Sequence, residues 1–273
     1  MSSRADIKLV LSDVDGTLVT KDQLLTEAVI AAARELHQAG IVLAITSSRP
    51  PRGLAMLVKP LGLTSVMAGF NGGVLLYPDQ TEIESHRLDP ATARRALDLV
   101  LDHRLDAWVY TDRDWLVRDR AGPHVAREAG TVKFEPEVVP AFTDDCLARA
   151  VKIVGVSDDY AQVAACAEAV RRVLGETASA TTSQPYYLDI TDPRANKGEV
   201  VVTLSRLLNI PIAQIATIGD GPNDVLMFEH SGFSIAMGNA AESVKAHASA
   251  VTDSNENSGW ASAMRRFVLG KDK

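Results

Sequence analysis

Two aspartates stand two residues apart near the N-terminus, where an apolar run ends and the chain continues as DVDGTLV. On a regular strand, residues i and i+2 point to the same side, so Asp13 and Asp15 can reach one reacting centre. Gly16 can turn the chain directly after them. Two neighbouring carboxylates suit a reaction in which one group attacks as a nucleophile and the other donates and accepts a proton.

Three further polar segments follow apolar runs, and a lysine begins a predicted helix. The segments are Thr46-Ser47-Ser48-Arg49, Gly69-Phe70-Asn71-Gly72-Gly73 and Gly219-Asp220-Gly221-Pro222-Asn223-Asp224, and the lysine is Lys197. In an open parallel sheet, ligands bind beyond the carboxyl ends of the strands. We therefore expect these segments to meet the two aspartates at one edge of a sheet, although they are far apart in the sequence.

The residue types at this edge favour a hard metal ion and a phosphoryl group. Several carboxylates packed together cannot all stay ionised without a cation. The candidate ligands all offer oxygen, which selects Mg²⁺, and they are Asp13, Asp15, Asp220 and Asp224. Ser47, Lys197 and helix N-termini would add donors for phosphoryl oxygens. The six histidines form no close pair and no HExxH pattern, so a zinc site is not predicted.

Four segments, in this order, resemble the four motifs of the haloacid dehalogenase-like (HAD) phosphatases. They are DVDGTL, the hydroxyl-rich TSSR, the lysine of NKG, and GDGPND. The C-terminal stretches AMGNA and VTDSNENSG are similar to the Cof-type branch, which carries a large α/β cap between the second and third motifs. The resemblance covers essentially the whole chain, and the full ordered set is far more specific than DxDGT alone.

The resemblance implies a role for each acid. Asp13 would be the nucleophile, and Asp15 would be the general acid and then the general base. Mg²⁺ would be held by the Asp13 carboxylate, the Asp15 backbone carbonyl and Asp220, with Asp224 close by. Ser47 and Lys197 would bind the transferring phosphoryl oxygens and complete the catalytic set. The resemblance and the strand-end positions also suggest a set of substrate-binding residues, namely Ser48, Arg49, Asn71, Gly72 and Asn223.

Two motifs depart from the family pattern. The second motif of many Cof-type proteins reads Thr-Gly-Arg, where this chain has Thr-Ser-Ser-Arg. Counting back from Arg49 places the motif hydroxyl on Ser47, with Thr46 as the alternative. The usual GDNxND is GDGPND here, which keeps both acids but loses one amide side chain.

The elements that would position these residues alternate between strand and helix. Short continuous apolar runs, typical of strands buried on both faces, occupy Ile7–Ser12, Ile41–Thr46 and Ser65–Phe70. Thr26 to Ala39 has a helical apolar stripe and is followed by Gly40. The same alternation returns after residue 190. We predict an α/β fold with a doubly wound, mostly parallel sheet, a Rossmann-like HAD core, built from residues 1–81 and 191–273.

Residues 82–190 have a different pattern and are predicted to form an inserted α+β cap domain. The expected elements are a strand near Glu82, a helix from Asp89-Pro90 to about His103, a hairpin around Arg113, the strand VKIVGVS, a helix from Asp159 to Leu174, and the strand YYLDI.

The charge, apolar runs and cysteines of the chain indicate which partners and which cellular compartment to expect. The chain has 273 residues with a net charge of −7, which argues against nucleic-acid or anionic-membrane partners. No apolar run approaches the ~20 residues of a membrane span, and acids appear too early for a secretory signal. Cys146 and Cys166 make no disulfide or metal pattern. We expect a cytoplasmic protein with two free thiols; no oligomeric state is predicted.

These observations predict a Mg²⁺-dependent phosphomonoester hydrolase that acts through an aspartyl-phosphate intermediate. Its partner would be a small-molecule phosphate ester, with sugar phosphates among the candidates. Two alternatives stay open: a phosphomutase of the same superfamily, and a non-catalytic phosphosugar-binding protein. Single motifs also have structural explanations, because aspartates form turns at strand ends, Lys197 could be a solvated helix-start lysine, and Asn71-Gly72 is a turn signal by itself.

Overall fold

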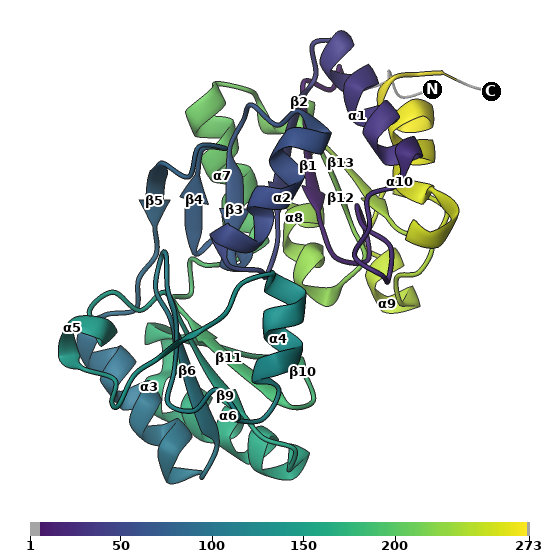
Figure 1. Cartoon of the computed structure of the whole chain (residues 1–273). Helices are drawn as coiled ribbons and strands as arrows, with labels where there is room; N and C mark the ends of the chain where they lie inside the picture. The colour runs from purple at the N-terminus through teal and green to yellow at the C-terminus, as the bar shows by residue number, and fades with distance from the viewer. Residues whose placement is uncertain (1–5, 272–273) are drawn as a thin grey trace.

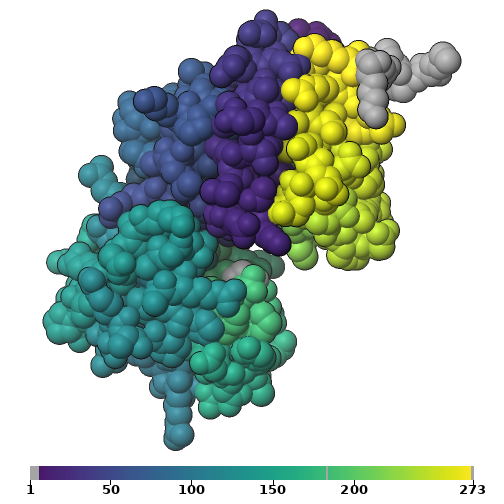
Figure 2. All heavy atoms as spheres, turned by 45° about the vertical axis from the view of Figure 1, so that its right-hand side comes forward, coloured from purple at the N-terminus to yellow at the C-terminus, as the bar shows by residue number. Residues whose placement is uncertain are grey.

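The computed structural model describes residues 6–271, which form two β-sheets in two lobes of the molecule (Figure 1). The larger sheet has eight strands in the order β14-β13-β12-β1-β2-β3-β4-β5, and the smaller has six in the order β10-β11-β9-β6-β7-β8. Both ends of the chain contribute to the larger sheet. We call residues 86–191, which hold the smaller sheet, the inserted module, and the remainder the core; Figure 2 shows them as separate lobes.

The core sheet is mostly parallel. Its strands are β1 (Leu9–Asp13), β2 (Val42–Thr46), β3 (Met67–Gly69), β4 (Val74–Leu76), β5 (Glu82–Ser85), β12 (Ile215–Gly219), β13 (Phe233–Ala236) and β14 (Ala250–Val251). Every pair from β14 through to β3 is parallel, whereas β4 and β5 are added in antiparallel fashion at one edge.

Helices cover both faces of this sheet. Its helices are α1 (Glu27–Gln38), α2 (Pro51–Leu61), α7 (Lys197–Leu208), α8 (Val225–Glu229), α9 (Glu242–Lys245) and α10 (Gly259–Ala263). On β1, Val10 packs with the side that carries α1, α2 and α10, while Leu9 and Leu11 pack with α7 and α8. A strand covered on both faces must be apolar throughout, which explains the continuous run. The predicted doubly wound α/β fold is confirmed.

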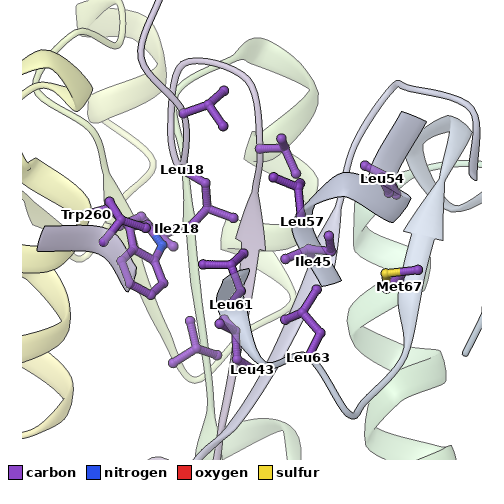
Figure 3. Packing of buried hydrophobic residues seen from close by; sticks show 14 of the residues in the cluster. Leu18, Leu43, Ile45, Leu54, Leu57, Leu61, Leu63, Met67, Ile218 and Trp260 are labelled. Carbon is purple, nitrogen blue, oxygen red and sulfur yellow. The ribbon is translucent and has the colours of Figure 1, made fainter. Parts of the chain in front are cut away.

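The packing on the α2 side fixes the end of β1 (Figure 3). Leu57 and Leu61 of α2 and Ile45 of β2 belong to one buried cluster with Trp260. The Trp260 indole Nε1 donates a hydrogen bond to Ser12 Oγ over 2.9 Å, and Ser12 Oγ donates to the Asp13 carbonyl over 2.7 Å. These contacts hold the backbone at the point where the first aspartate leaves the strand.

The inserted module is a sheet with helices on both of its faces. Its strands are β6 (Asp106–Tyr110), β7 (Trp115–Val117), β8 (Glu137–Val138), β9 (Lys152–Val156), β10 (Ser179–Gln184) and β11 (Tyr187–Thr191), and its helices are α3 (Pro90–Asp102), α4 (Val125–Val132), α5 (Asp144–Leu147) and α6 (Tyr160–Leu174). Helices α3 and α6 pack on one face. The other face packs with α4 and joins the same hydrophobic cluster as the core.

The predicted start of the module at residue 82 is wrong. Strand β5 pairs antiparallel with β4, so Glu82–Ser85 belongs to the core sheet. The turn at Asp79 therefore closes a hairpin inside the core, where Asp79 Oδ1 accepts a hydrogen bond from the Thr81 backbone over 2.9 Å. A local pattern indicates a strand but does not say which sheet it joins. Helix α4 and strand β10 also lie outside the predicted elements.

Both cysteines are buried and unpaired, as predicted. Over residues 6–271, no helix combines the length and the apolar character needed to cross a lipid bilayer.

Replacing Leu57 by alanine should lower the free energy of unfolding by about 2–5 kcal/mol, because a fully buried leucine loses its contacts and leaves a cavity. Urea unfolding followed by circular dichroism measures the change. The same substitution at Leu24, which is 63% exposed, is the matched control and should cost less than about 0.5 kcal/mol. Equal losses at the two leucines would contradict the packing of α2.

Candidate active site

The predicted site residues gather at the carboxyl edge of the core sheet. In the parallel register of β1 and β2, Asp13 stands beside Thr46, and Ser12 stands beside Ile218 of β12. The loops that follow these three strands therefore leave the sheet side by side. Segments from the two ends of the chain meet there because β1 lies between β2 and β12.

Lys197 is the buried centre of this edge. Its Nζ lies 2.5 Å from Asp13 Oδ1 and 2.6 Å from Asp224 Oδ1, and only 1% of its side chain is exposed. Asn196 places the lysine at the start of α7 by accepting a hydrogen bond from the Glu199 backbone over 3.0 Å. Burial alone would lower the pKa of Lys197, but the two carboxylates outweigh it and hold that pKa above its ordinary value.

Asp224 shapes the loop after β12. Its Oδ2 accepts hydrogen bonds from the backbone N–H groups of Asp220 and Gly221 over 2.9 and 2.8 Å, while Oδ1 accepts from Lys197. The sequence places Asp224 among the metal ligands; in the structure one of its oxygens lies in the carboxylate cluster, and its hydrogen bonds also position Lys197 and the loop.

Three carboxylates crowd around this lysine. One oxygen each of Asp13, Asp220 and Asp224 lie within 4.8 Å of one another. Burial raises the pKa of Asp13 well above its usual range against the pull of Lys197, and burial together with Asp224 raises the pKa of Asp220 to about 6. One ammonium cannot balance three carboxylates. A divalent cation with a preference for oxygen would balance them, so the donor set fits Mg²⁺.

Asp220 is held by residues that the sequence analysis did not single out. Thr17 Oγ1 donates to Asp220 Oδ1 over 3.2 Å, and Asn239 Nδ2 donates to Oδ2 over 3.0 Å and to the Gly16 carbonyl over 2.9 Å. Gly16 has φ +76°, and a Cβ there would collide with the Asp220 carboxylate. Thr17 and Asn239 lie inside DVDGTL and AMGNA, so the motifs contained the signal without giving these residues a role.

Arg49 is paired with Asp15. Its Nε and Nη2 donate to the two carboxylate oxygens over 2.8 and 2.6 Å, and the arginine is buried. Ser47 Oγ lies 3.5 Å from Asp15 Oδ2 and accepts a hydrogen bond from the Arg49 backbone over 3.1 Å. The sequence predicts Arg49 as a substrate ligand, and in the structure its guanidinium pairs with the second aspartate.

The two candidate hydroxyls of the second motif have different surroundings. Ser47 reaches Asp15, whereas the Thr46 hydroxyl is buried without a hydrogen-bond partner among the described residues. Ser48 is half-buried in the same loop. The geometry therefore favours Ser47 as the hydroxyl nearest the acids, and Thr46 stays the alternative.

The turn after β3 joins the site from the other side. The Asn71 backbone N–H donates to the Ser47 carbonyl over 2.8 Å, and Asn223 Nδ2 donates to Asn71 Oδ1 over 3.1 Å. Gly72 is buried against Val200 of α7, in a space that a side chain could not share. Asn71 and Asn223 thus lie at the site, while Gly72 packs between the turn and α7.

Comparison with known proteins agrees with this arrangement. A family model described as haloacid dehalogenase-like hydrolase matches residues 10–264. The chain belongs to this family. The predicted family and the prediction of a hydrolase are thereby confirmed.

Individual relatives are similar over most of their length. The chain is 26% identical to a 5-amino-6-(5-phospho-D-ribitylamino)uracil phosphatase of Bacillus subtilis, covering 97% of each protein. It is 28% identical to an HMP-PP phosphatase of Cronobacter sakazakii, covering 84% of this chain and 83% of the relative. A haloacid dehalogenase-like hydrolase from Bacteroides thetaiotaomicron has the same fold, with a TM-score of 0.88 at 23% identity over 95% of this chain and 99% of that one.

Mg²⁺ should raise the melting temperature, and more so at about pH 7.5 than at about pH 5. Because the pKa of Asp220 is raised in the fold, binding of a proton to Asp220 stabilises the metal-free protein. This stabilisation is lost as the pH rises through about 6. Above that pH, bound Mg²⁺ takes the place of the proton and stabilises the ionised carboxylate. Differential scanning fluorimetry with and without Mg²⁺ measures the shift. Asp220→Asn should abolish most of the gain and the exposed Asp22→Asn should keep it; an equal gain at both pH values would contradict the site.

Proposed function

We propose that this hydrolase is a Mg²⁺-dependent phosphomonoester hydrolase that acts on a small phosphorylated metabolite through an aspartyl-phosphate on Asp13. The observation that carries the proposal is the pairing of Asp13 with the buried Lys197 inside a carboxylate cluster, next to a second aspartate fixed by an arginine. The named activities of two relatives, both phosphatases, support the same reaction class.

In the proposed first step, a carboxylate oxygen of Asp13 attacks phosphorus, and the P–O bond to the leaving alcohol breaks. Lys197 holds Asp13 Oδ1, which orients the nucleophile and adds positive charge near the phosphoryl oxygens. Asp15 gives its proton to the leaving oxygen. In the second step, Asp15 takes a proton from water, which attacks phosphorus and releases phosphate from Asp13.

Asp15 cannot act as an acid while both of its oxygens accept hydrogen bonds from Arg49. A phosphate dianion offers the guanidinium a competing pair of acceptor oxygens. Substrate binding would thus release one bond of the pair and leave Asp15 able to carry a proton. This exchange makes Arg49 both an orienting group for Asp15 and a ligand of the substrate.

The proposed ligands of Mg²⁺ are the Asp13 and Asp220 carboxylates and the Asp15 backbone carbonyl. Bound there, Mg²⁺ would supply positive charge that neutralises the cluster and the phosphoryl oxygens. Ser47 and Asn223 complete the proposed phosphate-binding set. The free thiols fit the proposed cytoplasmic setting, and the net charge of −7 fits a small-molecule ester as the partner in place of nucleic acid or membrane.

The alternatives differ in their products. A phosphomutase would return the phosphoryl group to a hexose, and a phosphosugar-binding protein would release nothing. The complete acid pair and the paired Lys197 favour turnover over simple binding. Release of free phosphate from a panel of esters, with no isomer formed in the presence of a bisphosphate activator, distinguishes the hydrolase from both.

Activity should require Mg²⁺, and Ca²⁺ should inhibit, because its larger and more variable coordination shell would misplace Asp13 relative to phosphorus. Phosphate release from p-nitrophenyl phosphate, measured across a Mg²⁺ titration with and without added Ca²⁺, tests this. Full turnover in excess chelator would contradict the metal-dependent mechanism.

Asp13→Asn should abolish turnover and leave no covalent species, since the nucleophile is gone. Asp15→Asn should slow turnover by roughly 10²–10⁴, the usual range for a positioned acid–base group. With an aryl phosphate, whose leaving group needs little protonation, the first step survives better than the second. The Asp15→Asn protein should therefore accumulate phosphate on Asp13, measured by intact mass after an acid quench. Asp22→Asn is the exposed control, and label on a serine or histidine would refute the assignment.

A further inference from the structure

The module face that looks toward the core carries polar side chains that the proposed mechanism does not use. Tyr110 Oη donates to Glu128 Oε1 over 3.1 Å, and Lys152 Nζ lies 2.8 Å from Asp189 Oδ1. The Lys152 and Asp189 side chains are only 13% and 8% exposed. We call these four residues the module cluster. A charged group is costly to bury unless a partner of opposite charge or a ligand compensates for its lost hydration.

The sheet and α4 bring the module cluster together. Strand β9 pairs antiparallel with both β6 and β11. Tyr110 of β6 stands beside Lys152, and Asp189 of β11 stands beside Val154. Lys152 and Val154 are two residues apart on β9, so all of these side chains point to the face opposite α3 and α6. Helix α4 buries Val125, Ala129 and Val132 against this face. The helix thereby sets Glu128 over the sheet, with its carboxylate on Tyr110.

Two contacts place this face over the candidate active site. The Phe70 ring, directly before Asn71, lies 5.4 Å from the Tyr110 ring. Val151, directly before β9, lies against Gly73 at the end of the same turn. Tyr110 also holds the Glu128 carboxylate, so Glu128 belongs to the face that lies against this turn of the candidate active site.

The same face holds buried donors without partners. Among the described residues, none accepts a hydrogen bond from Trp108 Nε1, Trp115 Nε1 or Tyr187 Oη, although Trp108 and Trp115 are each only 1% exposed. The Trp115 ring stacks on Tyr110 at 5.7 Å, and the Trp108 ring lies 5.3 Å from Tyr187. Buried donors are normally satisfied, so unpaired ones beside the module cluster suggest polar atoms of a ligand.

We propose, resting on the proposed function, that Glu128 selects the leaving group, accepting neutral groups rich in hydroxyls and rejecting a second anionic group. Two carboxylates against one ammonium leave the module cluster negative, which repels a second phosphate or carboxylate. Hydroxyls can donate to Glu128 and Asp189 and accept from Lys152 and the indole donors.

The test compares Glu128→Gln with the wild-type protein on three substrates: a hexose monophosphate, a hexose bisphosphate and p-nitrophenyl phosphate. The amide keeps the shape of the side chain but removes its charge. We expect kcat/KM for the monophosphate to fall at least about tenfold and that for the aryl ester less than about threefold, because an aryl group offers no hydroxyl to read. The ratio of kcat/KM for the bisphosphate to kcat/KM for the monophosphate should rise. Tyr110→Phe, which removes one hydroxyl, should shift selectivity in the same direction.

The matched control is Glu137→Gln, an exposed glutamate on β8 of the same module, which should leave all three rates within about twofold. A parallel fall on all three substrates with Glu128→Gln, or an unchanged substrate ranking, would overturn the selectivity role. Melting temperatures of the variants separate a folding defect from either result. Failure of the wild-type protein to hydrolyse even the aryl ester with Mg²⁺ would instead refute the proposed function, so the two failures are distinguishable.

Discussion

The buried ammonium of Lys197 is the interaction on which the rest of the site depends. It joins Asp13 at the end of β1 to Asp224 in the loop after β12. A buried charge that loses its partner costs several kcal/mol, so the three side chains constrain one another. Asp224 passes the constraint to the loop through two backbone N–H groups, and the loop sets Asp220 against Gly16. Two ends of the chain thereby form one site.

The core and its edge were predictable because the physics is local or topological. A strand covered on both faces must be apolar, so β1 and β2 stand out in the sequence. Parallel topology then brings Asp13 and Asp220 to one edge, where Lys197 at the start of α7 pairs with Asp13. The partner of Arg49 was not predictable. Its side chain is long enough to reach a ligand or a neighbouring acid, and only the folded geometry shows that it forms an ion pair with Asp15.

The module was harder to predict for two physical reasons. Strand β5 is short and only partly buried, and its pattern is the same whether it joins the core sheet or the module sheet. Helix α4, VAREAGTV, contains a glycine and β-branched residues that favour helix weakly. Its packing against the module sheet supplies what the local sequence lacks. Long-range contacts therefore decide both elements, and the sequence shows them poorly.

The contact between module and core buries the edge of the sheet where the candidate active site lies. One hydrophobic cluster runs through both, with Phe70 against Tyr110 and Val151 against Gly73. Asp13, Lys197 and Asp224 are buried and therefore lie in a region poor in water, where charge interactions are stronger. The same contact places Tyr110, which donates to Glu128, against Phe70 beside the site. Under the proposed role of Glu128, a leaving group that does not suit the module face would disturb this contact, and the acids would then act in a wetter region where charge interactions are weaker.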